Sequence, residues 1–564
     1  MWVGLLRRRD ACAPPLAHAI SRALRLAVQG FCSDQRGAVS VLFGIMFILL
    51  LMFAAIAIDH SRFTSEAIQN QHALDAALLA ASDALGQENQ DQLALARARA
   101  FYKANRPDGA ELDVDKVVIH PEDGSLEGSS KFDWKTTLLQ AFGWDKVRIG
   151  TAARVARGGT AEIALVLDNS GSMSGSYIED LKAASTNLIN TVFYGVDGEG
   201  KVALSIVPFA GSVNVGPAYR GSSWIDNDGS SSVSRENADV PRSRFQLFDD
   251  LGVSWAGCVE MRPAPYDASD VPPDPGNPDT LFVPMFAPDE PDDVNSGGSN
   301  YSNNYISDDG GTCPKMECTC QRWRSPGKCA SNGWVLAELQ PAAAQARTCK
   351  YSGAQVGYGM TTDKCKRGSY DGAGPNAFCT TVPLLPLSIT KAEALTAIAS
   401  MKASGMTNIG EGLAWGWRTL SPGAPFTAGR AYDDGENKKI IILMTDGQNT
   451  YTHSSNHNGS AHGAAGYAKP FAHPDSGRLG TSYSSSSYSA KLTERTRAVC
   501  AGAKSAGIKI YTIAFRLEND AATQALLQEC ASDSKSAFAA SNGAILIETF
   551  QNIAREIANL RLTN

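Results

Sequence analysis

The sequence predicts a doubly wound α/β sheet that is interrupted by a cysteine-rich insertion and preceded by a single N-terminal transmembrane helix and a small α+β region. Three observations carry this prediction. Strand-like and helix-like segments alternate on both sides of residues 216–385. Within those residues the hydrophobic periodicity disappears, and eight of the 12 cysteines gather there. An uncharged apolar run precedes both regions.

The apolar run, Ala38–Ile58, contains 21 residues and no charge. At about 1.5 Å per residue, a helix of this length crosses a hydrocarbon core of about 30 Å. A cleavable signal peptide is the rival interpretation, but the apolar core is long and no small-x-small site follows it. Six arginines before the run predict a cytoplasmic N-terminus. The chain is therefore expected to be a single-pass protein of the inner membrane, with its bulk in the periplasm or at the cell surface.

The charge distribution limits the kinds of partner. A net charge of −7 and a pI near 5.7 argue against a general nucleic-acid binder. Acidic residues concentrate between residues 220 and 309, where there are 17 acidic residues and five arginines. The stretch 267–309 lacks the EF-hand pattern, so we expect it to form a solvated acidic surface and not a calcium loop.

Six parts are predicted along the chain. A cytoplasmic segment (residues 1–37) and the transmembrane helix (38–58) precede a helical stalk with a small β region (59–157). The α/β domain follows in two parts, 158–215 and 386–564, which flank a disulfide-rich insertion at 216–385. We expect the insertion to be a disulfide-stapled subdomain, because structureless loops of that length are uncommon in compact domains.

The regular elements of the α/β domain follow from apolar runs and helical periodicity. The predicted strands are 161–167, 201–207, 439–445 and 508–515. The predicted helices are 177–192, 390–401, 409–419, 490–505, 521–531 and 545–560. Residues 61–102 are predicted as one or two further helices with a break near Gly86, and residues 110–157 as a small β unit.

Cysteine usage agrees with export. Ten of the 12 cysteines follow the apolar run, and an oxidising compartment favours disulfides. A zinc site at Cys313, Cys318, Cys320 and Cys329 is the alternative, but paired CxxC motifs are missing. Cys500 and Cys530 stand apart on two predicted helices and are expected to pair. The connectivity of the eight cysteines between 258 and 379 stays open.

Oxygen-bearing side chains occur at two strand ends and one helix start. Asp168, Ser170 and Ser172 directly follow a buried strand, Asp446 follows another, and Thr407 precedes a helix. Loops at the carboxyl ends of parallel strands converge, so these side chains are expected to lie together. Hard oxygen ligands suit Mg²⁺, with Mn²⁺ or Ca²⁺ as alternatives. The competing interpretation is that Asp168 and Ser170 only cap the following helix.

The order Asp-x-Ser-x-Ser, then Thr407, then Asp446 resembles the metal-ion-dependent adhesion site of von Willebrand factor A domains. The resemblance implies that Asp168, Ser170, Ser172, Thr407 and Asp446 hold a divalent metal. It also implies that the metal keeps an open position, which an acidic side chain of a partner completes. Such a site binds protein and performs no catalysis.

A second resemblance covers almost the whole chain. Arg36-Gly37-Ala38-Val39-Ser40-Val41 before the apolar run, the segment Trp255–Glu260, and the segments around Cys500 and Cys530 resemble the TadG type of the TadE/TadG-like proteins of tight-adherence (Flp) pilus systems. This implies an envelope protein that assembles or anchors pili, with pilus-assembly or envelope proteins as partners. One departure stands out: no acid follows Gly37 at the fifth position, so we expect an uncleaved anchor.

Other residue patterns give weaker indications of function. His453, His457, His462 and His473 lie in a Gly/Ser-rich loop that is expected to be polar and exposed, with transition-metal binding as the alternative. GxSxG, HExxH and GxxxxGK[ST] motifs are absent from the sequence, so no enzyme is expected.

Three functions remain open at this stage. The first is a membrane-anchored, metal-dependent protein-binding module in pilus assembly or surface adhesion. The second is a structural envelope scaffold that does not use the metal. The third is an exported hydrolase with its site in the insertion. The first is favoured.

Overall fold

The computed structural model describes residues 38–560 except for 83, 86–88, 107–109, 121–124, 156–158, 195, 292–300, 307, 309–316, 321–322, 326–327, 330–333, 338–340, 354–373, 473–476 and 481–483. It divides into two compact units. The first holds the described residues up to Leu78 together with Ala98–Val117 and Gly128–Ala153, and the second holds the others.

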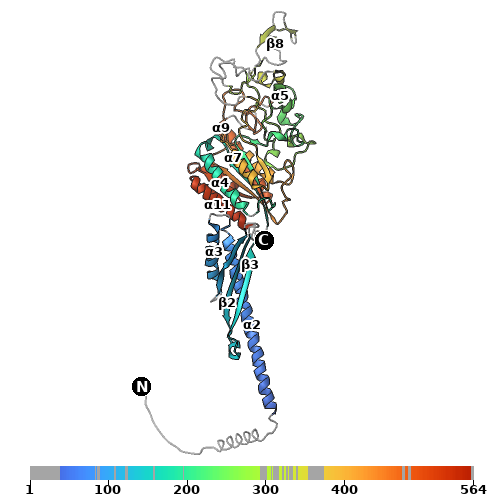
Figure 1. Cartoon of the computed structure of the whole chain (residues 1–564). Coiled ribbons are helices and arrows are strands. Elements are labelled where there is room, and N and C mark those ends of the chain that lie inside the picture. The colour runs from blue at the N-terminus through green and yellow to red at the C-terminus, as the bar shows by residue number, and fades with distance from the viewer. Residues whose placement is uncertain are drawn as a thin grey trace, which may run out of the picture. The chain divides into compact units, whose positions relative to one another are not determined.

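The first unit is built on one long helix and a three-stranded sheet. Helix α2 (Ala38–Ser82) is long and apolar enough to cross a membrane. It precedes helix α3 (Gln90–Asn105) and the sheet β1-β2-β3, formed by Glu111–His120, Ser125–Lys135 and Lys146–Val155. Figure 1 shows the sheet alongside α2.

A buried amide ties these elements together. Asn70 of α2 accepts a hydrogen bond from the Tyr102 hydroxyl of α3 at 2.6 Å. It donates to Ser130 Oγ on β2 at 3.0 Å and to Thr151 Oγ1 on β3 at 2.9 Å. One side chain therefore fixes a helix and two strands on α2, and its own polar atoms are satisfied although it is fully buried.

The second unit contains a mixed sheet of the order β15-β14-β13-β4-β5-β6-β7, with β12 added beside β5. Its parallel core consists of β4 (Thr160–Asp168), β5 (Val202–Phe209), β13 (Asn437–Thr445), β14 (Lys509–Phe515) and β15 (Ala537–Ala540). Three short strands are antiparallel: β6 (Val213–Asn214), β7 (Cys258–Val259) and β12 (Leu385–Ser388).

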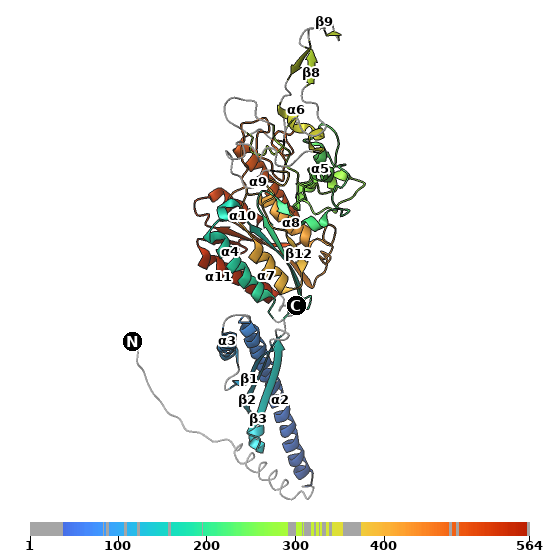
Figure 2. The same cartoon turned by 45° about the horizontal axis from the view of Figure 1, so that its top comes forward.

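Helices cover both faces of this sheet (Figure 2). Helices α4 (Ser176–Val192), α7 (Lys391–Ser400) and α11 (Gly543–Leu560) share one buried apolar cluster with the sheet. Helices α8 (Ile409–Leu420), α9 (Ser485–Ser505) and α10 (Ala521–Cys530) share the other. The predicted doubly wound α/β class is confirmed. The short strands β6, β7, β12 and β15 were not predicted, because two to four residues are too few to show a period.

The insertion continues the core of the domain. Its regular elements are few: α5 (Arg244–Leu251), α6 (Pro341–Ala346), the β8/β11 pair (Glu317–Cys320 and Trp334–Ala337) and the β9/β10 pair (Trp323–Ser325 and Lys328–Cys329). Yet Phe248, Phe282 and Phe286 of the insertion belong to the same apolar cluster as Trp415 of α8. The rings of Phe282 and Trp415 lie 4.6 Å apart. In its described part, the insertion therefore stabilises itself by packing on α8.

Two expectations about exposure are wrong for part of their residues, although Asp274 and His453 are exposed as expected. Asp289 of the acidic stretch is fully buried, and it accepts a hydrogen bond from Lys350 Nζ at 2.9 Å; Asp267 and Glu290 are buried as well. His462, expected in an exposed loop, is fully buried. Burial, reinforced by the charges of Arg244 and Arg478, lowers the pKa of His462 well below its ordinary value. Ion pairs with distant segments accommodate Asp289 (Lys350) and Asp267 (Arg495), and local sequence gives no sign of such partners.

Disulfides are present, as predicted. Cys500 of α9 pairs with Cys530 of α10. Cys258 pairs with Cys379, which joins the two ends of the cysteine-rich region, and Cys349 is also disulfide-bonded. Cys313, Cys365 and His473 lie outside the described residues.

Candidate metal site

Two neighbouring parallel strands bring the first of the predicted site residues together. In the β4/β13 pair, Leu167 lies opposite Met444, so the next residues of the two strands, Asp168 and Thr445, are also neighbours. Asp446 follows at the end of β13. The carboxyl ends of parallel strands share one edge of a sheet, which explains why residues 278 positions apart in sequence become neighbours.

A continuous chain of hydrogen bonds links the predicted ligands. Ser170 Oγ and Ser172 Oγ lie 3.0 Å apart, and Ser172 Oγ donates to Asp446 Oδ1 at 2.7 Å. The Ser170 backbone N–H donates to Asp168 Oδ1 at 2.8 Å. Four of the five predicted residues thus form a single cluster of oxygen atoms.

The loop that carries Thr407 is tied to this cluster by backbone contacts. Gly171 N–H donates to the Gly405 carbonyl at 2.9 Å, and a Cβ on Gly171 would lie 3.4 Å from that oxygen. Thr407 is 3% exposed, and its N–H donates to Thr450 Oγ1 at 2.9 Å. Both hydrogen bonds described for Thr407 use its backbone. The structure therefore places Thr407 on the loop beside the cluster.

Helix capping does not account for Asp168 and Ser170. The N-cap of α4 is Gly175, which makes no side-chain cap hydrogen bond. The short 3₁₀ turn Gly171–Met173 begins at Ser170, also without a side-chain cap. Asp168 instead accepts hydrogen bonds at both of its oxygens within the cluster.

Burial sets the electrostatics of the cluster. Asp168 is fully buried, which raises its pKa to about 6, and the nearby charge of Asp446 contributes to the rise. Burial also raises the pKa of Asp446, which is half-buried. Two carboxylates that disfavour each other's ionisation form a site that a cation would stabilise.

One participant was not predicted. Thr445 Oγ1 donates to Asp168 Oδ2 at 2.5 Å and so occupies the second oxygen of the buried carboxylate. The signal was available in the sequence, since Thr445 ends the strand immediately before Asp446. Its role depended on the register between β4 and β13, which sequence alone did not define.

The donor set fits a hard divalent cation. Within the described residues, no group of three or more His, Cys, Asp or Glu side chains comes together as a metal site. The cluster instead offers two carboxylates and two serine hydroxyls, and Ser172 is exposed. Neutral hydroxyl ligands with few carboxylates suit Mg²⁺ and leave residual positive charge on the ion.

Replacing Thr445 tests the electrostatic balance of the cluster. The Thr445 hydrogen bond lowers the pKa of Asp168, so we expect Thr445→Val to raise that pKa further and to weaken Mg²⁺ binding near neutral pH about tenfold, the equivalent of roughly one lost charge-assisted hydrogen bond. Thr445→Ser keeps the hydroxyl and is the matched control. Titration calorimetry measures both. Equal affinities for the two variants would contradict the role assigned to this hydroxyl.

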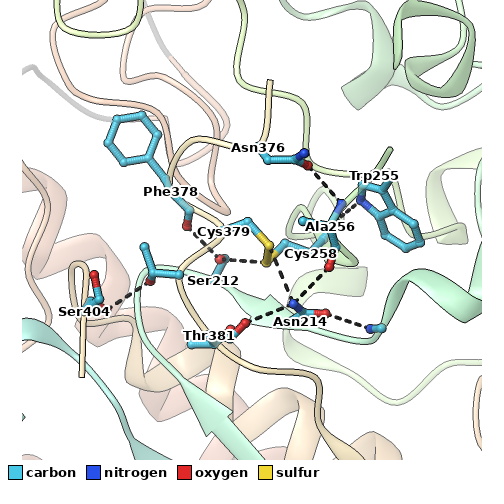
Figure 3. The surroundings of a disulfide bond; sticks show 12 residues. Ser212, Asn214, Trp255, Ala256, Cys258, Asn376, Phe378, Cys379, Thr381 and Ser404 are labelled. Atoms are coloured by element: carbon cyan, nitrogen blue, oxygen red, sulfur yellow. Dashed lines mark hydrogen bonds between the residues drawn. A yellow bond between two sulfur atoms is a disulfide. The ribbon is translucent and has the colours of Figure 1, made fainter. Parts of the chain in front are cut away.

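The Cys258–Cys379 disulfide lies near the segment that carries Ser404, three residues before Thr407 (Figure 3). Next to Cys379 of the Cys258–Cys379 bond, Thr380 Oγ1 donates to the Ser404 carbonyl at 3.0 Å. A Cβ on Gly405 would meet that hydroxyl at 2.6 Å, and Gly405 adopts a φ of +94°. The loop geometry at this point therefore requires glycine.

Asn214 organises the other side of the disulfide (Figure 3). Its amide donates to the carbonyls of Ala256 at 3.1 Å and Thr381 at 3.0 Å, and its Oδ1 accepts from Gly216 N–H. Ser212 Oγ donates to the Phe378 carbonyl at 3.2 Å. Strand β6, the turn before it and both ends of the cysteine-rich region are thus held together.

Comparison with known proteins identifies the domain. The model of the von Willebrand factor type A domain family matches residues 379–552, a range that contains Thr407 and Asp446. Asp168, Ser170 and Ser172 precede the insertion and lie outside that match. No curated protein matches the chain.

Solved structures similar to the chain include domains from pili. The von Willebrand factor domain of the type V pili tip protein Mfa5 from Porphyromonas gingivalis is 11% identical, with a TM-score of 0.31, over 72% of this chain and 98% of that one. The pilus adhesins SpaC from Lactobacillus rhamnosus GG and RrgA from Streptococcus pneumoniae are each 11% identical, with TM-scores of 0.30. They are matched over 80% and 79% of this chain, which spans 34% and 48% of theirs. At these TM-scores the likenesses carry no argument about function.

The family match and the doubly wound sheet together lead to one conclusion. The chain contains a von Willebrand factor type A domain with a disulfide-bonded insertion. In the sequence, the domain follows an N-terminal apolar helix that is long enough to cross a membrane.

Proposed function

We propose that this chain is a membrane-anchored, divalent-metal-dependent protein-binding module that acts in Flp/tight-adherence pilus assembly or surface adhesion. The observation that carries the proposal is the oxygen cluster of Asp168, Ser170, Ser172 and Asp446 at the carboxyl edge of the parallel strands. Thr407 is proposed as the fifth ligand. No enzymatic activity is assigned.

The accessibility of the cluster supports protein binding. Asp168 and Ser170 are buried at its inner side, whereas Ser172 is exposed and Asp446 half-exposed on its outer side. A Mg²⁺, Mn²⁺ or Ca²⁺ ion held by these residues would supply a Lewis-acidic position toward the solvent. A carboxylate of a partner protein has the charge and hardness that such a position takes.

Helix α2 supports the proposed membrane anchoring. The side chains from Leu42 to Phe53 include ten large hydrophobic residues that are 43% or more exposed: Leu42, Phe43, Ile45, Met46, Phe47, Ile48, Leu49, Leu50, Leu51 and Phe53. Exposed apolar surface of this extent on a helix is stable in a lipid bilayer and unstable in water. The arginines before it favour a cytoplasmic N-terminus and so support a location of the type A domain outside the inner membrane.

The pilus role rests on resemblance and is tested in cells. In a bacterium that produces this protein and Flp pili, Asp168→Ala is expected to abolish pilus formation or surface adherence while the protein remains at wild-type abundance. Asp433→Ala is the matched control, because it removes an exposed carboxylate in the turn before β13, at the opposite end of that strand. Pili are counted by electron microscopy, and adherence is measured on abiotic surfaces.

The scaffold hypothesis predicts a different result. If the domain only organises pilus partners, Asp168→Ala leaves pili and adherence intact, and deletion of the protein removes them. That outcome would overturn metal dependence and would leave the envelope role standing.

A further inference from the structure

The hairpin tip that joins β2 to β3, residues 136–145, has an unusual surface. Its sequence from Thr136 to Trp144 carries no charge, Asp145 is its one charged residue, and Lys135 and Lys146 flank it. Leu138 is 39% exposed and Trp144 is 59% exposed, and Val147 beyond them is 38% exposed. A large exposed tryptophan beside exposed aliphatic side chains marks an interaction surface and not a core.

Asp59 fixes where this tip lies. It is the first residue after the apolar run of α2, it is 1% exposed, and its carboxylate accepts backbone N–H groups from the tip. Leu138 N and Leu139 N donate to Asp59 Oδ2 at 2.9 and 2.7 Å, and Thr137 N donates to Oδ1 at 3.2 Å. The tip is therefore fastened to α2 at the residue where the apolar run ends.

Burial extends into the apolar run itself. Ala55 lies one helical turn before Asp59 on the same face of α2 and is 5% exposed, although most of its neighbours in the run are exposed. Both views show the tip alongside α2 (Figures 1 and 2). On the other side of Asp59, Arg62 Nη1 donates to Thr137 Oγ1 at 2.7 Å. The tip thus overlaps the last turn of the apolar run.

We propose that the tip is a second membrane contact, whose partner is the headgroup–acyl boundary of the same bilayer that α2 crosses. The inference rests on the proposed membrane anchor and deepens it. A segment fastened to the end of a membrane span lies at the interface, where an indole ring can bury its apolar body and keep its N–H hydrated. Lys135, at the end of β2, and Lys146, at the start of β3, flank the tip and can reach lipid phosphates. The first unit would then rest on the bilayer at two points, the helix and the tip.

The test places fluorotryptophan in the full chain, reconstituted in vesicles of phosphatidylethanolamine and phosphatidylglycerol. The fluorine line of Trp144 is assigned by its loss in Trp144→Phe. Trp134→Phe assigns the reference line of Trp134, which is half-buried and packs edge-on against Phe63 on the far side of Asp59. Because Trp144 is largely exposed, the phenylalanine variant is expected to fold normally.

A lipid with a nitroxide near its headgroup is expected to broaden the Trp144 line until it disappears and to broaden the Trp134 line less. A water-soluble paramagnetic chelate is expected to leave the Trp144 line unchanged. If the chain floats with the vesicles but the chelate alone broadens Trp144, the tip contact is wrong and the anchor stands. Protection of Trp144 from both agents would assign the tip to another protein surface and overturn the lipid contact. Failure of the chain to float would overturn the anchor and, with it, this inference.

Discussion

Magnesium is expected to raise the thermal unfolding midpoint of the type A domain in the wild-type chain, and Asp168→Asn is expected to abolish that rise. At a Mg²⁺ concentration of about 100 times the dissociation constant, binding to the folded state alone contributes about 2.7 kcal/mol. Near-ultraviolet circular dichroism of the full chain in detergent, with and without Mg²⁺, measures the midpoint.

The variant is expected to behave unusually in the absence of metal. The folded-state pKa of Asp168 is raised from 3.8 to about 6, so this group stabilises the fold most below pH 3.8, and that contribution is lost as the pH rises through 6. Near pH 7 the ionised buried carboxylate costs about 3 kcal/mol. Asparagine removes this charge and keeps one acceptor oxygen. Without metal, Asp168→Asn is therefore expected to be at least as stable as the wild type near neutral pH.

The sign of this effect separates the two interpretations of Asp168. A residue that only holds a turn would destabilise the domain when replaced and would leave the response to Mg²⁺ unchanged. Asp433→Ala serves as the control and should keep the full response. A wild-type midpoint that does not move with Mg²⁺ or Mn²⁺ would reject the metal site and move the weight to the scaffold function.

The sequence was most informative for the central strands, in which every side chain is buried. Ile163–Leu167 and Ile440–Met444 are continuous apolar runs, as expected for central parallel strands covered on both faces, and the structure shows them fully buried. The polar residues that follow such runs emerge at one edge, which is why the cluster of Asp168 and Asp446 could be predicted. The short edge strand β12 carries no comparable pattern.

Long-range partners were beyond the sequence. Asp289 looked like a solvated acid because its partner, Lys350, is 61 positions away and beyond a cysteine-rich segment. His462 looked exposed because its loop is polar, although it lies 3.8 Å from the buried Glu260. Local composition reports the average exposure of a segment, whereas burial of a charge such as that of Asp289 depends on one specific counter-charge.

Removing the Cys258–Cys379 disulfide is expected to destabilise the type A domain strongly. The bond closes a loop with a sequence separation of 121 residues. Chain entropy alone assigns such a loop about 5 kcal/mol, and measured losses commonly fall at 2–5 kcal/mol. The double variant Cys258→Ser/Cys379→Ser is therefore expected to unfold at a markedly lower denaturant concentration.

The same variant is expected to weaken Mg²⁺ binding. Thr380 follows Cys379 directly, and its hydroxyl holds the Ser404 carbonyl next to Gly405, whose own carbonyl accepts from Gly171 N–H. Loss of the disulfide removes the covalent constraint next to Thr380, the first residue in this series of contacts. The loop of Thr407 would then sample more conformations, and ordering it on metal binding would cost free energy.

Cys500→Ser/Cys530→Ser is the matched control, because that disulfide joins α9 to α10 with a sequence separation of 30 and contributes about 3.6 kcal/mol in the same model. Both double variants should lose stability, but only Cys258→Ser/Cys379→Ser should lose Mg²⁺ affinity under conditions where the domain remains folded. If both keep the wild-type affinity, the site loop is held by the sheet alone. If both double variants lose Mg²⁺ affinity equally, the loss reflects a general destabilisation of the domain. A selective loss would mean that the insertion, through its disulfide, determines how well the adhesion-type site is formed, and that a reducing environment weakens metal binding before it unfolds the domain.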